Sequence, residues 1–534
     1  MSFLRKNTMI LAALTCLSLV PGRLFAQTVD LNNEPVGNLP VVTELYNFVY
    51  DGIGVSGYSH GKNLYSELIQ GADGNFYGTT LNGGSGACAD GFGIEGCGTI
   101  FKLTPAGVQT VLFNFPYDST TNTAVDGIYP VGGLVQGRDG AFYGVASAGG
   151  NPNAGGNGCT LGCGTVFKIT STGHFTLLHQ FAGGGANPPE GAVPEGRLVQ
   201  GSDGRFYGTT NSGGQVQAFY NQGTIFAITS TGGFTTLHQF DNIHGVVDGV
   251  NPYAGLTQGK DGNFYGTTYF GGTDGVGTVF RVTRAGAVTI LHSFKQPTHL
   301  EFPDGAYPLA ALVQATDGNF YGATTVGGVS PGSYGVVFRI TPQGAFTNLA
   351  DFVPPTGIYP EGGMIQASDG NLYGTTVNGG PSDCLCGSVY QLTLAGVLTE
   401  VTGFEDVNNG RWPLSVPLQA ANGLIYVTTS RGPSLTTHDG GGAIVQINNG
   451  LSKPKPTIVR FNPTSGKVGA SVTISGSNFI GTSGVTFNGK AATFTVRSTN
   501  SITATVPAGA TTGPIKVTNA GGSATSTAVF TVVP

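Results

Sequence analysis

Short apolar runs and glycine turns alternate along most of the chain. Residues 254–259 form one apolar run, Asp261-Gly262 is a turn pair, and residues 263–268 form a second run. Residues 277–283 and 287–294 alternate apolar and polar side chains, which is the period of a half-buried strand. We expect the Asp-Gly pair to close a two-residue hairpin in which both residues have φ > 0. The stretch therefore predicts four antiparallel strands.

The same pattern recurs along the chain as a phrase close to Asp-Gly-Asn-Phe-Tyr-Gly-Thr-Thr. Its seven copies begin at Asp73, Asp139, Asp203, Asp261, Asp317, Asp369 and, in a worn form, Asn422. Each interval holds four short strands, and such a unit cannot bury both of its faces alone. Seven units packed around an axis predict an all-β fold, a seven-bladed β-propeller.

The two ends of the repeat array complement each other. Residues 42–48 match the fourth strand of other repeats, for example residues 175–181, although they stand before the first repeat. The seventh repeat stops at its third strand, residues 443–448. We therefore predict that residues 42–48 complete blade seven and close the ring, because closure removes free sheet edges.

These repeats resemble the GloVer tandem repeats of exported bacterial proteins and, more distantly, the blades of sensor propellers. The resemblance covers about residues 42–450 and implies architecture and export. It brings no catalytic residues with it.

A short linker at residues 451–456 leads into a second domain at 457–534. About seven short strands with regular turn signals predict an immunoglobulin-like sandwich there. The segment resembles an IPT/TIG domain. The residues that carry this resemblance are Pro456, Ile458, Pro463, Gly466, Val472, Ile474, Gly476, Phe479, Val485, Phe487, Val506, Pro507 and Val517.

Composition supports the all-β class and excludes some partners. Gly accounts for 90 of 534 residues, and only 10% of residues are charged. The formal net charge of −6, without a basic block, argues against a nucleic-acid partner.

The N-terminus has the features of a signal peptide. Arg5 and Lys6 precede an apolar run, and Ala26 fits a cleavage site, so we expect removal of residues 1–26, followed by a lead-in at 27–41. No later apolar run is long enough to span a membrane. We expect export by the general secretion route to the periplasm, cell surface or extracellular space.

Six cysteines remain after that cleavage, in three pairs that each occupy a loop between second and third strands. We expect disulfides between Cys88 and Cys97 and between Cys159 and Cys163, because neighbouring blades are too far apart to bridge. Cys384 and Cys386 are a weaker pair, since one intervening residue strains the ring.

Metal ions and cofactors are not expected. His179, His238 and His292 occupy one slot of the fourth strand, so the repeat places them in different blades and they cannot share a metal. No phosphate-binding loop or nucleophile motif is present.

Acidic and aromatic residues gather in the segments that cross from one blade to the next. These segments should lie on the same face as the loops between second and third strands. The candidate binding residues are Asp126, Tyr129, Glu190, Asp248, Asp304, Tyr307, Tyr359 and Trp412. Acids beside aromatic rings are typical of sugar and peptide sites. The alternative is that Asp-Gly turns and Tyr-Pro pairs only pack the blades together.

The predicted function is non-catalytic binding or surface scaffolding, with a carbohydrate or a protein as ligand. One alternative is a carbohydrate-active hydrolase or lyase. It would need two convergent acids among Asp126, Glu190, Asp248 and Asp304, about 5–5.5 Å apart for retaining chemistry. The other alternative is a purely structural envelope protein.

Overall fold

The computed structural model describes residues 40–534 except 54–56, 91–92, 95, 122, 152–158, 160, 184–189, 215–221, 241–247, 297–301, 330–333, 355, 381–384, 406–408 and 433–440. The elements in these residues are all β-strands, which confirms the predicted all-β class. None of the described residues forms a helix long and apolar enough to cross a membrane. The predicted signal peptide and most of the lead-in lie outside the described residues.

Seven four-stranded antiparallel sheets occupy residues 41–448, and we number them repeat sheets 1 to 7. Repeat sheet 1 contains β2 (Ile69–Gln70), β3 (Phe76–Thr80), β6 (Thr99–Leu103) and β7 (Gln109–Asn114). Repeat sheet 2 contains β8 (Val135–Gln136), β9 (Phe142–Ala146), β10 (Thr165–Ile169) and β11 (Phe175–Gln180). Repeat sheet 3 contains β13 (Val199–Gln200), β14 (Phe206–Thr210), β16 (Thr224–Ile228) and β17 (Phe234–Gln239). Repeat sheet 4 contains β18 (Thr257–Gln258), β19 (Phe264–Thr268), β20 (Thr278–Val282) and β21 (Val288–Ser293).

The remaining sheets of the array follow the same order. Repeat sheet 5 contains β22 (Val313–Gln314), β23 (Phe320–Ala323), β24 (Val336–Ile340) and β25 (Phe346–Asp351). Repeat sheet 6 contains β26 (Met364–Gln366), β27 (Leu372–Thr376), β28 (Ser388–Leu392) and β29 (Leu398–Gly403). Repeat sheet 7 contains β30 (Leu418–Gln419), β31 (Ile425–Thr429), β32 (Ala443–Asn448) and β1 (Val41–Asn47). Two short pairs lie in loops: β4 (Ala89–Asp90) with β5 (Gly93–Ile94), and β12 (Gly191–Ala192) with β15 (Ser212–Gly213).

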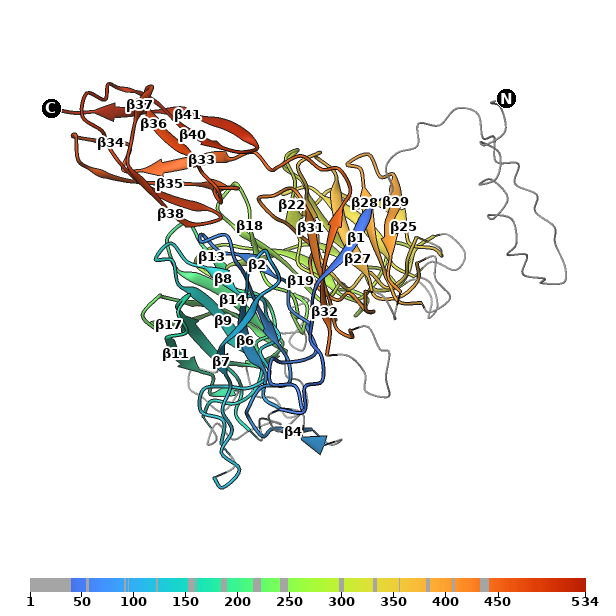
Figure 1. The fold of residues 1–534 in the computed structure, drawn as a ribbon. Coiled ribbons are helices and arrows are strands. Elements are labelled where there is room, and N and C mark those ends of the chain that lie inside the picture. The colour runs from blue at the N-terminus through green and yellow to red at the C-terminus, as the bar shows by residue number, and fades with distance from the viewer. Residues whose placement is uncertain are drawn as a thin grey trace, which may run out of the picture. The chain divides into compact units, whose positions relative to one another are not determined.

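The predicted pairing of the two ends of the array is present. Strand β1 lies antiparallel to β32, from Val41 opposite Asn448 to Asn47 opposite Ala443, and Figure 1 shows the blue β1 beside the orange strands of repeat sheet 7. A register shift between Glu44 and Tyr46 interrupts this pairing. The fourth strands of the other six repeat sheets have the same irregularity against their third strands. Strand β1 therefore has the geometry of a fourth strand.

The first hairpin of each repeat differs from its prediction in two ways. In repeat sheet 4, only Thr257–Gln258 pairs, although the whole of 254–259 was expected to form a strand. Gly255 lies outside the ladder, and its backbone packs against repeat sheet 3. The approach is so close that a Cβ on Gly255 would lie 2.4 Å from the Arg197 carbonyl oxygen. In the turn, only Gly262 has a positive φ, 85°. The turn is therefore a three-residue loop ending in a left-handed glycine, not a two-residue hairpin.

Each turn aspartate also binds the tyrosine of its own repeat. The Tyr265 hydroxyl donates to Asp261 Oδ2 at 2.8 Å, and the Asn263 backbone N–H donates to Asp261 Oδ1 at 3.1 Å. The equivalent hydroxyl-to-carboxylate bond in five other repeats spans 2.7–2.9 Å. The seventh copy has Asn422 in place of the acid, and its amide donates to the Tyr426 hydroxyl.

Neighbouring repeat sheets are joined by one glutamine each. The Gln136 Oε1 atom accepts the Ala72 N–H of the preceding sheet at 2.9 Å, and Gln136 Nε2 donates to the Gly140 carbonyl of its own turn. The same bond from sheet to sheet is made by Gln200, Gln258, Gln314, Gln366 and Gln419. Gln70 of repeat sheet 1 accepts from Ala421 of repeat sheet 7 at 2.9 Å. The seventh sheet thus contacts the first as the others contact their neighbours.

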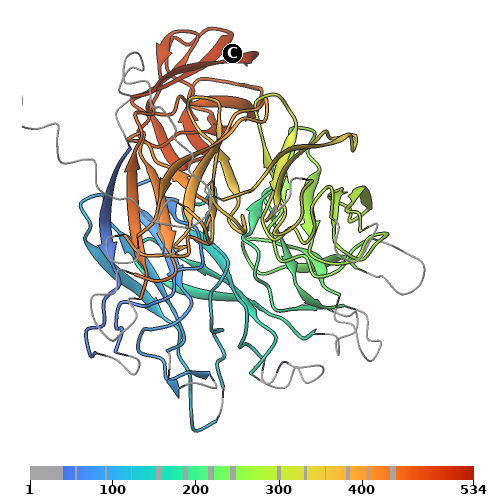
Figure 2. The same ribbon diagram turned by 90° about the vertical axis from the view of Figure 1, so that its right-hand side faces the viewer.

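The buried cores lie between neighbouring repeat sheets. One cluster joins Tyr77 and Ile100 of repeat sheet 1 to Phe142 and Phe167 of repeat sheet 2. The Tyr77 and Phe142 rings stack with centroids 4.0 Å apart. Another cluster joins repeat sheets 7 and 1. Figure 2 shows the sheets following one another from blue through green and yellow to orange.

Two further sheets lie after residue 456. One contains β33 (Thr457–Asn462), β35 (Ser471–Ser477), β39 (Ser501–Thr505) and β38 (Phe494–Ser498). The other contains β34 (Ser465–Gly466), β41 (Gly522–Val532), β40 (Gly513–Asn519), β36 (Gly484–Phe487) and β37 (Lys490–Ala491). Ile474 and Ile502 of the first sheet share one buried cluster with Val485, Ile515 and Val517 of the second.

Candidate functional site

Two sets of loops meet in every repeat sheet. The segment ahead of each first strand forms a β-bridge with the segment that follows the second strand, for example Ile128 with Ala148 and Ala306 with Val326. The other bridges are Lys62–Asn82, Val250–Phe270, Ile358–Asn378 and Arg411–Arg431, and β12 with β15 in repeat sheet 3. The prediction that these loops share one face is confirmed, and we call it the loop face.

The segment before the first strand of each repeat sheet contains a residue with a left-handed backbone, which we call the slot residue. The seven slot residues are Asn63, Tyr129, Val193, Asn251, Tyr307, Tyr359 and Trp412, with φ between 56° and 60°. Each slot N–H donates to a carbonyl of the preceding repeat sheet over 2.5–3.1 Å, as Trp412 does to Cys386. Each slot carbonyl accepts from its own sheet, as Trp412 does from Ser430. The slot backbone therefore ties two sheets together.

The slot side chains are not explained by this backbone role. A left-handed φ costs a residue with a Cβ about 1–2 kcal/mol, and asparagine tolerates it best. Asn63 and Asn251 show that asparagine fits the slot. Tyr129, Tyr307, Tyr359 and Trp412 are nevertheless large rings, and all four remain partly exposed. Tyr129 packs on the core between repeat sheets 1 and 2, and Tyr307 packs on the core between repeat sheets 4 and 5, which accounts for these two rings.

Three of the four predicted acids are bound by the three histidines. His179 Nε2 lies 3.1 Å from Glu190 Oε2, His238 Nε2 lies 2.7 Å from Asp248 Oδ2, and His292 Nε2 lies 2.9 Å from Asp304 Oδ2. Each pair joins the fourth strand of one repeat sheet to the segment before the first strand of the next sheet. The histidine position of one repeat thus pairs with the acid position of the next, a relation that the sequence analysis missed.

Asp126 differs from the other three acids. In the preceding repeat sheet, Phe113 occupies the fourth-strand position that holds histidine in three other repeats. Its ring stacks on Phe175, with centroids 4.0 Å apart. Within the described ranges Asp126 has no ion pair, and burial raises its pKa above the ordinary value. The four predicted acids therefore serve separate junctions between sheets.

A second group of acids and rings comes together on the loop face. The Tyr253 and Tyr269 ring centroids are 5.4 Å apart, and those of Tyr269 and Tyr307 are 5.1 Å apart. Glu195 precedes them in repeat sheet 3, and Glu361 follows them in repeat sheet 6. We call Glu195, Tyr253, Tyr269, Tyr307 and Glu361 the Glu–Tyr cluster.

Hydrogen bonds and electrostatic interactions link this cluster. Asn211 donates to Glu195 Oε2 at 2.8 Å, and the Asn251 amide donates to the Asn211 carbonyl at 2.8 Å. Burial, followed by the charge of Glu195, raises the pKa of Tyr253. Burial, followed by Tyr307 and Glu361, raises the pKa of Tyr269. Both glutamates are therefore within electrostatic range of the rings.

Sequence reasoning identified only Tyr307 from this cluster. Glu195, Tyr253 and Glu361 each follow the proline after a slot residue, a position that holds Leu309 and Leu414 in other repeats. Only repeats 3 and 6 have an acid at this position, so the periodic pattern did not mark it as a site. The position in the repeat could have identified them, because this residue directly follows the proline next to the slot residue.

The first strands pack tightly just beyond the cluster. Arg197 Nε lies 3.1 Å from Glu67 Oε1, an ion pair that joins repeat sheets 3 and 1. Repeat sheet 2 has glycine between them, and a Cβ on Gly133 would lie 2.6 Å from the Glu67 carboxyl carbon. The segments ahead of the first strands of repeat sheets 1, 2 and 3 therefore lie in direct contact.

Trp412 is in contact with two arginines on the same face. Its ring lies 4.7 Å from the Arg411 guanidinium carbon and 5.8 Å from that of Arg431. These distances are within the range of a cation–π interaction. Its indole therefore lies in a charged, partly exposed setting and not in a core.

The comparisons with known proteins decide the family. The Gloeobacter/Verrucomicrobia repeat matches residues 156–299 and 297–497, which is more than half of the chain. The chain belongs to this family. The GloVer resemblance of the repeats is thereby confirmed. Repeat sheet 1 and the first two strands of repeat sheet 2 precede the matched residues, and they have the same strand order as the other sheets.

Solved structures show only distant likeness to this Gloeobacter/Verrucomicrobia repeat protein, and no curated protein matches it. A fungal alcohol oxidase in complex with copper is 13% identical, with a TM-score of 0.47, over 94% of this chain and 100% of that one. A gluconolactonase from Xanthomonas campestris is 14% identical, with a TM-score of 0.32, over 53% of this chain and 78% of that one. A putative glucose dehydrogenase from Thermus thermophilus is 13% identical, with a TM-score of 0.35, over 76% and 99%. With TM-scores below 0.5, none indicates a function here.

Two predicted disulfides of the repeat protein are present. Cys88 is bonded to Cys97 and Cys159 to Cys163, with Cα–Cα distances of 5.1 and 5.0 Å. Cys386 is buried, and Cys384 lies outside the described residues. Both described bonds close loops between second and third strands, so they fix the loop face.

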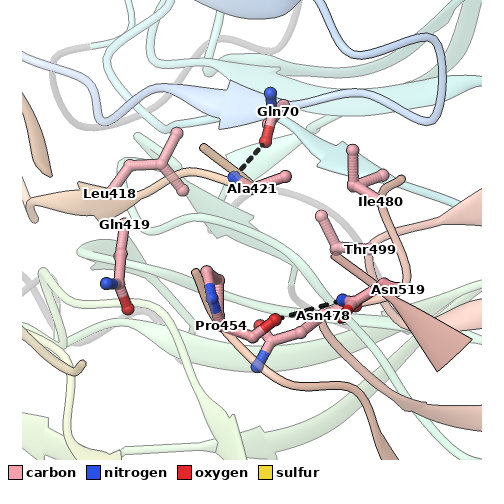
Figure 3. A pocket seen from close by; sticks show the side chains of 9 residues that line it. All are labelled: Gln70, Leu418, Gln419, Ala421, Pro454, Asn478, Ile480, Thr499 and Asn519. Carbon is pink, nitrogen blue, oxygen red and sulfur yellow. Dashed lines mark hydrogen bonds between the residues drawn. The ribbon is translucent and has the colours of Figure 1, made fainter. Parts of the chain in front are cut away.

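The repeat protein has a further pocket away from the loop face. It is lined by Gln70, Leu418, Gln419, Ala421, Pro454, Asn478, Ile480, Thr499 and Asn519, which Figure 3 shows. None of these lining side chains titrates. Gln70 and Gln419 are engaged in bonds between repeat sheets, and Asn519 donates to the Pro454 and Asn478 carbonyls. In the described residues no three His, Cys, Asp or Glu side chains are grouped as metal ligands.

Proposed function

We propose that this Gloeobacter/Verrucomicrobia repeat protein is an exported, non-catalytic binding or surface scaffold protein. Its binding surface is the loop face, and its ligand is a carbohydrate or a protein. Residues 1–26 are removed during export by the general secretion route. The mature chain comprises the lead-in, a closed seven-bladed β-propeller at 42–450, a linker at 451–456 and an IPT/TIG immunoglobulin-like domain at 457–534.

The repeated contacts between sheets support a closed propeller. Strand β1 completes repeat sheet 7, and the bond from Ala421 to Gln70 joins that sheet to the first. The two sheets after residue 456 enclose one apolar core, as the two layers of a sandwich do. Disulfides persist in oxidising compartments, which supports export.

The aromatic slot residues carry the proposal of binding. Tyr359 and Trp412 adopt a strained backbone that asparagine satisfies better in two other repeats. Strained residues concentrate at functional sites, where the side chain justifies the strain. Partly exposed rings beside acids and arginines suit the apolar faces and hydroxyls of a sugar.

Replacing a ring by asparagine tests this proposal. Trp412→Asn and Tyr359→Asn keep the slot backbone favourable and remove the ring. A glycan array on the mature protein supplies ligands, and calorimetry should show at least a tenfold weaker affinity in both variants. Val193→Asn, at a slot without a ring, is the matched control and should bind normally. Hits that bind all variants equally would contradict the proposal for this face. An array without hits would exclude a carbohydrate and leave a protein ligand or a purely structural envelope protein.

The hydrolase or lyase alternative loses the acids that it named. Glu190, Asp248 and Asp304 are each bound to a different histidine, and retaining chemistry needs two acids about 5–5.5 Å apart. A hydrolysis assay on the array hits tests this alternative directly. Turnover that survives Glu190→Gln, Asp248→Asn and Asp304→Asn would assign any catalysis to other residues.

A further inference from the structure

The Glu–Tyr cluster combines ring faces with negative charge. Its three tyrosines come from repeat sheets 4 and 5, and its glutamates come from repeat sheets 3 and 6, so it spans four consecutive sheets. The Tyr269 ring lies edge-on to Tyr253, at 80°, and near-parallel to Tyr307, at 29°. All five side chains are partly exposed. The cluster is therefore a surface that a ligand can cover.

The two glutamates lack the cationic partners that other acids of this protein have. Glu67 pairs with Arg197, and Glu190 pairs with His179. In the part of the chain that the structure describes, neither Glu195 nor Glu361 has a Lys, Arg or His within ion-pair distance. Burial raises the pKa of both, and the hydrogen bond from Asn211 only partly offsets this for Glu195. A carboxylate that is partly desolvated without a cation favours a positively charged ligand.

We propose that the Glu–Tyr cluster binds an oligosaccharide whose sugars carry free amino groups. This inference rests on the proposed binding function of the loop face and names its ligand class. The tyrosine rings stack on the pyranose faces, and the ammonium groups pair with Glu195 and Glu361. An ammonium group also gains from the electron-rich ring faces of tyrosine.

The spread of the cluster determines how the sugar lies. Its rings and glutamates come from four consecutive repeat sheets, so the chain of sugars lies across the loop face. Several pyranose rings can then meet the tyrosines in turn.

A matched pair of ligands tests the charge requirement on the unmodified protein. A β-1,4-linked glucosamine tetramer and its fully N-acetylated counterpart share the same rings and differ in the ammonium groups. Calorimetry at pH 7 with the disulfide-bonded mature protein should show at least tenfold tighter binding of the glucosamine tetramer. Added salt should weaken that binding more than binding of the acetylated tetramer.

Charge-removing variants locate the site. Glu195→Gln and Glu361→Gln should each weaken binding of the glucosamine tetramer about tenfold. Glu400→Gln is the matched control, because burial also raises the pKa of Glu400, which lies in β29. Gln at 195 can still accept the bond from Asn211, so a melting curve should confirm an intact fold.

The outcomes separate this inference from the proposed function. Equal binding of the two tetramers, or binding that both Gln variants retain, overturns the inference. If the array then yields other sugars that need Trp412 or Tyr359, the binding function stands with a different ligand class. An array without hits overturns this inference and leaves a protein as the ligand of the proposed function.

Discussion

At the scale of single residues, the polar pairs of the loop face serve different purposes. Glu190, Asp248 and Asp304 each hold a histidine of the preceding repeat sheet, whereas Glu195 and Glu361 face rings without a cation. A paired acid supports folding through its charge. An unpaired, partly buried acid opposes folding at neutral pH.

Glu190 should make stability fall in acid. Burial pushes its pKa up, but hydrogen bonds from His179 and the Ala182 N–H, with the charge of His179, bring the pKa below its ordinary value of 4.5. A lowered folded pKa adds stability above the unfolded pKa, and this is lost as pH falls through the folded pKa. Because the pair is partly exposed, we expect about 1 kcal/mol. Urea unfolding of wild type and Glu190→Gln should differ at pH 7 and converge below pH 4.5.

Asp126 provides the control of opposite sign. Burial raises its pKa above 3.8, so its contribution favours folding at low pH and is lost as pH rises through the folded value. Asp126→Asn should therefore leave the protein equally stable or more stable at pH 7. A loss of stability in both variants at pH 7 would show that the charges are not the cause.

At the scale of elements, glycines set how closely neighbouring repeat sheets approach. Gly98 has φ of 97°, and a Cβ there would lie 2.5 Å from the Thr80 carbonyl oxygen and 2.6 Å from Pro130 Cδ. The proline after the slot residue meets a glycine of the preceding sheet in the same way at Gly164, Gly223, Gly277, Gly335 and Gly387. The junction therefore needs glycine for space as well as for conformation.

Two alanine substitutions separate these needs. Gly140 is the turn glycine of repeat sheet 2, with φ of 86°, and a Cβ there would have no other atom within 4 Å. Gly140→Ala should cost about 1 kcal/mol from conformation alone. Gly98→Ala should cost about 3 kcal/mol, because a steric clash adds to the same strain. Equal losses in thermal unfolding would show that Pro130 and Thr80 move aside freely.

The sequence predicted the elements better than their junctions. The seven repeats, the pairing of residues 42–48 with the last repeat, and two disulfides follow from patterns within one repeat or at its ends. The bond from Ala421 to Gln70 could not be predicted, because the pattern within a repeat does not give the register against the next. Gly255 was placed in a strand because its run is apolar, although its backbone packs against Arg197. Only two of the seven repeats have an acid at the position of Glu195 and Glu361, so periodicity does not mark it as a site.

At the scale of the whole molecule, contacts between repeat sheets matter more than any one sheet. Each core cluster takes residues from two sheets, so a sheet without its neighbour leaves an apolar face exposed. Strand β1 occupies the position next to β32 that would otherwise be an open edge. Unpaired edges and apolar faces are the usual starting points of aggregation.

Removing the closing strand should destabilise the whole array. Deletion of residues 27–48 takes away β1 and Phe48, which is fully buried between repeat sheets 7 and 1. We expect a melting temperature at least 10 °C lower and association in light scattering. Deletion of residues 27–39 keeps β1 and is the control, with an unchanged melt. A normal melt after the longer deletion would show that β1 is dispensable.

The pairing of β1 with β32 also imposes an order in time. Strand β1 is made before every other strand of the array, and its partner follows about 400 residues later, which takes roughly 20 to 80 s at ordinary rates of synthesis. Until then β1 has no strand to pair with, and repeat sheet 7 cannot be completed. The last step of folding therefore waits for nearly the entire array, and a chain interrupted during translation retains an unpaired strand at its beginning.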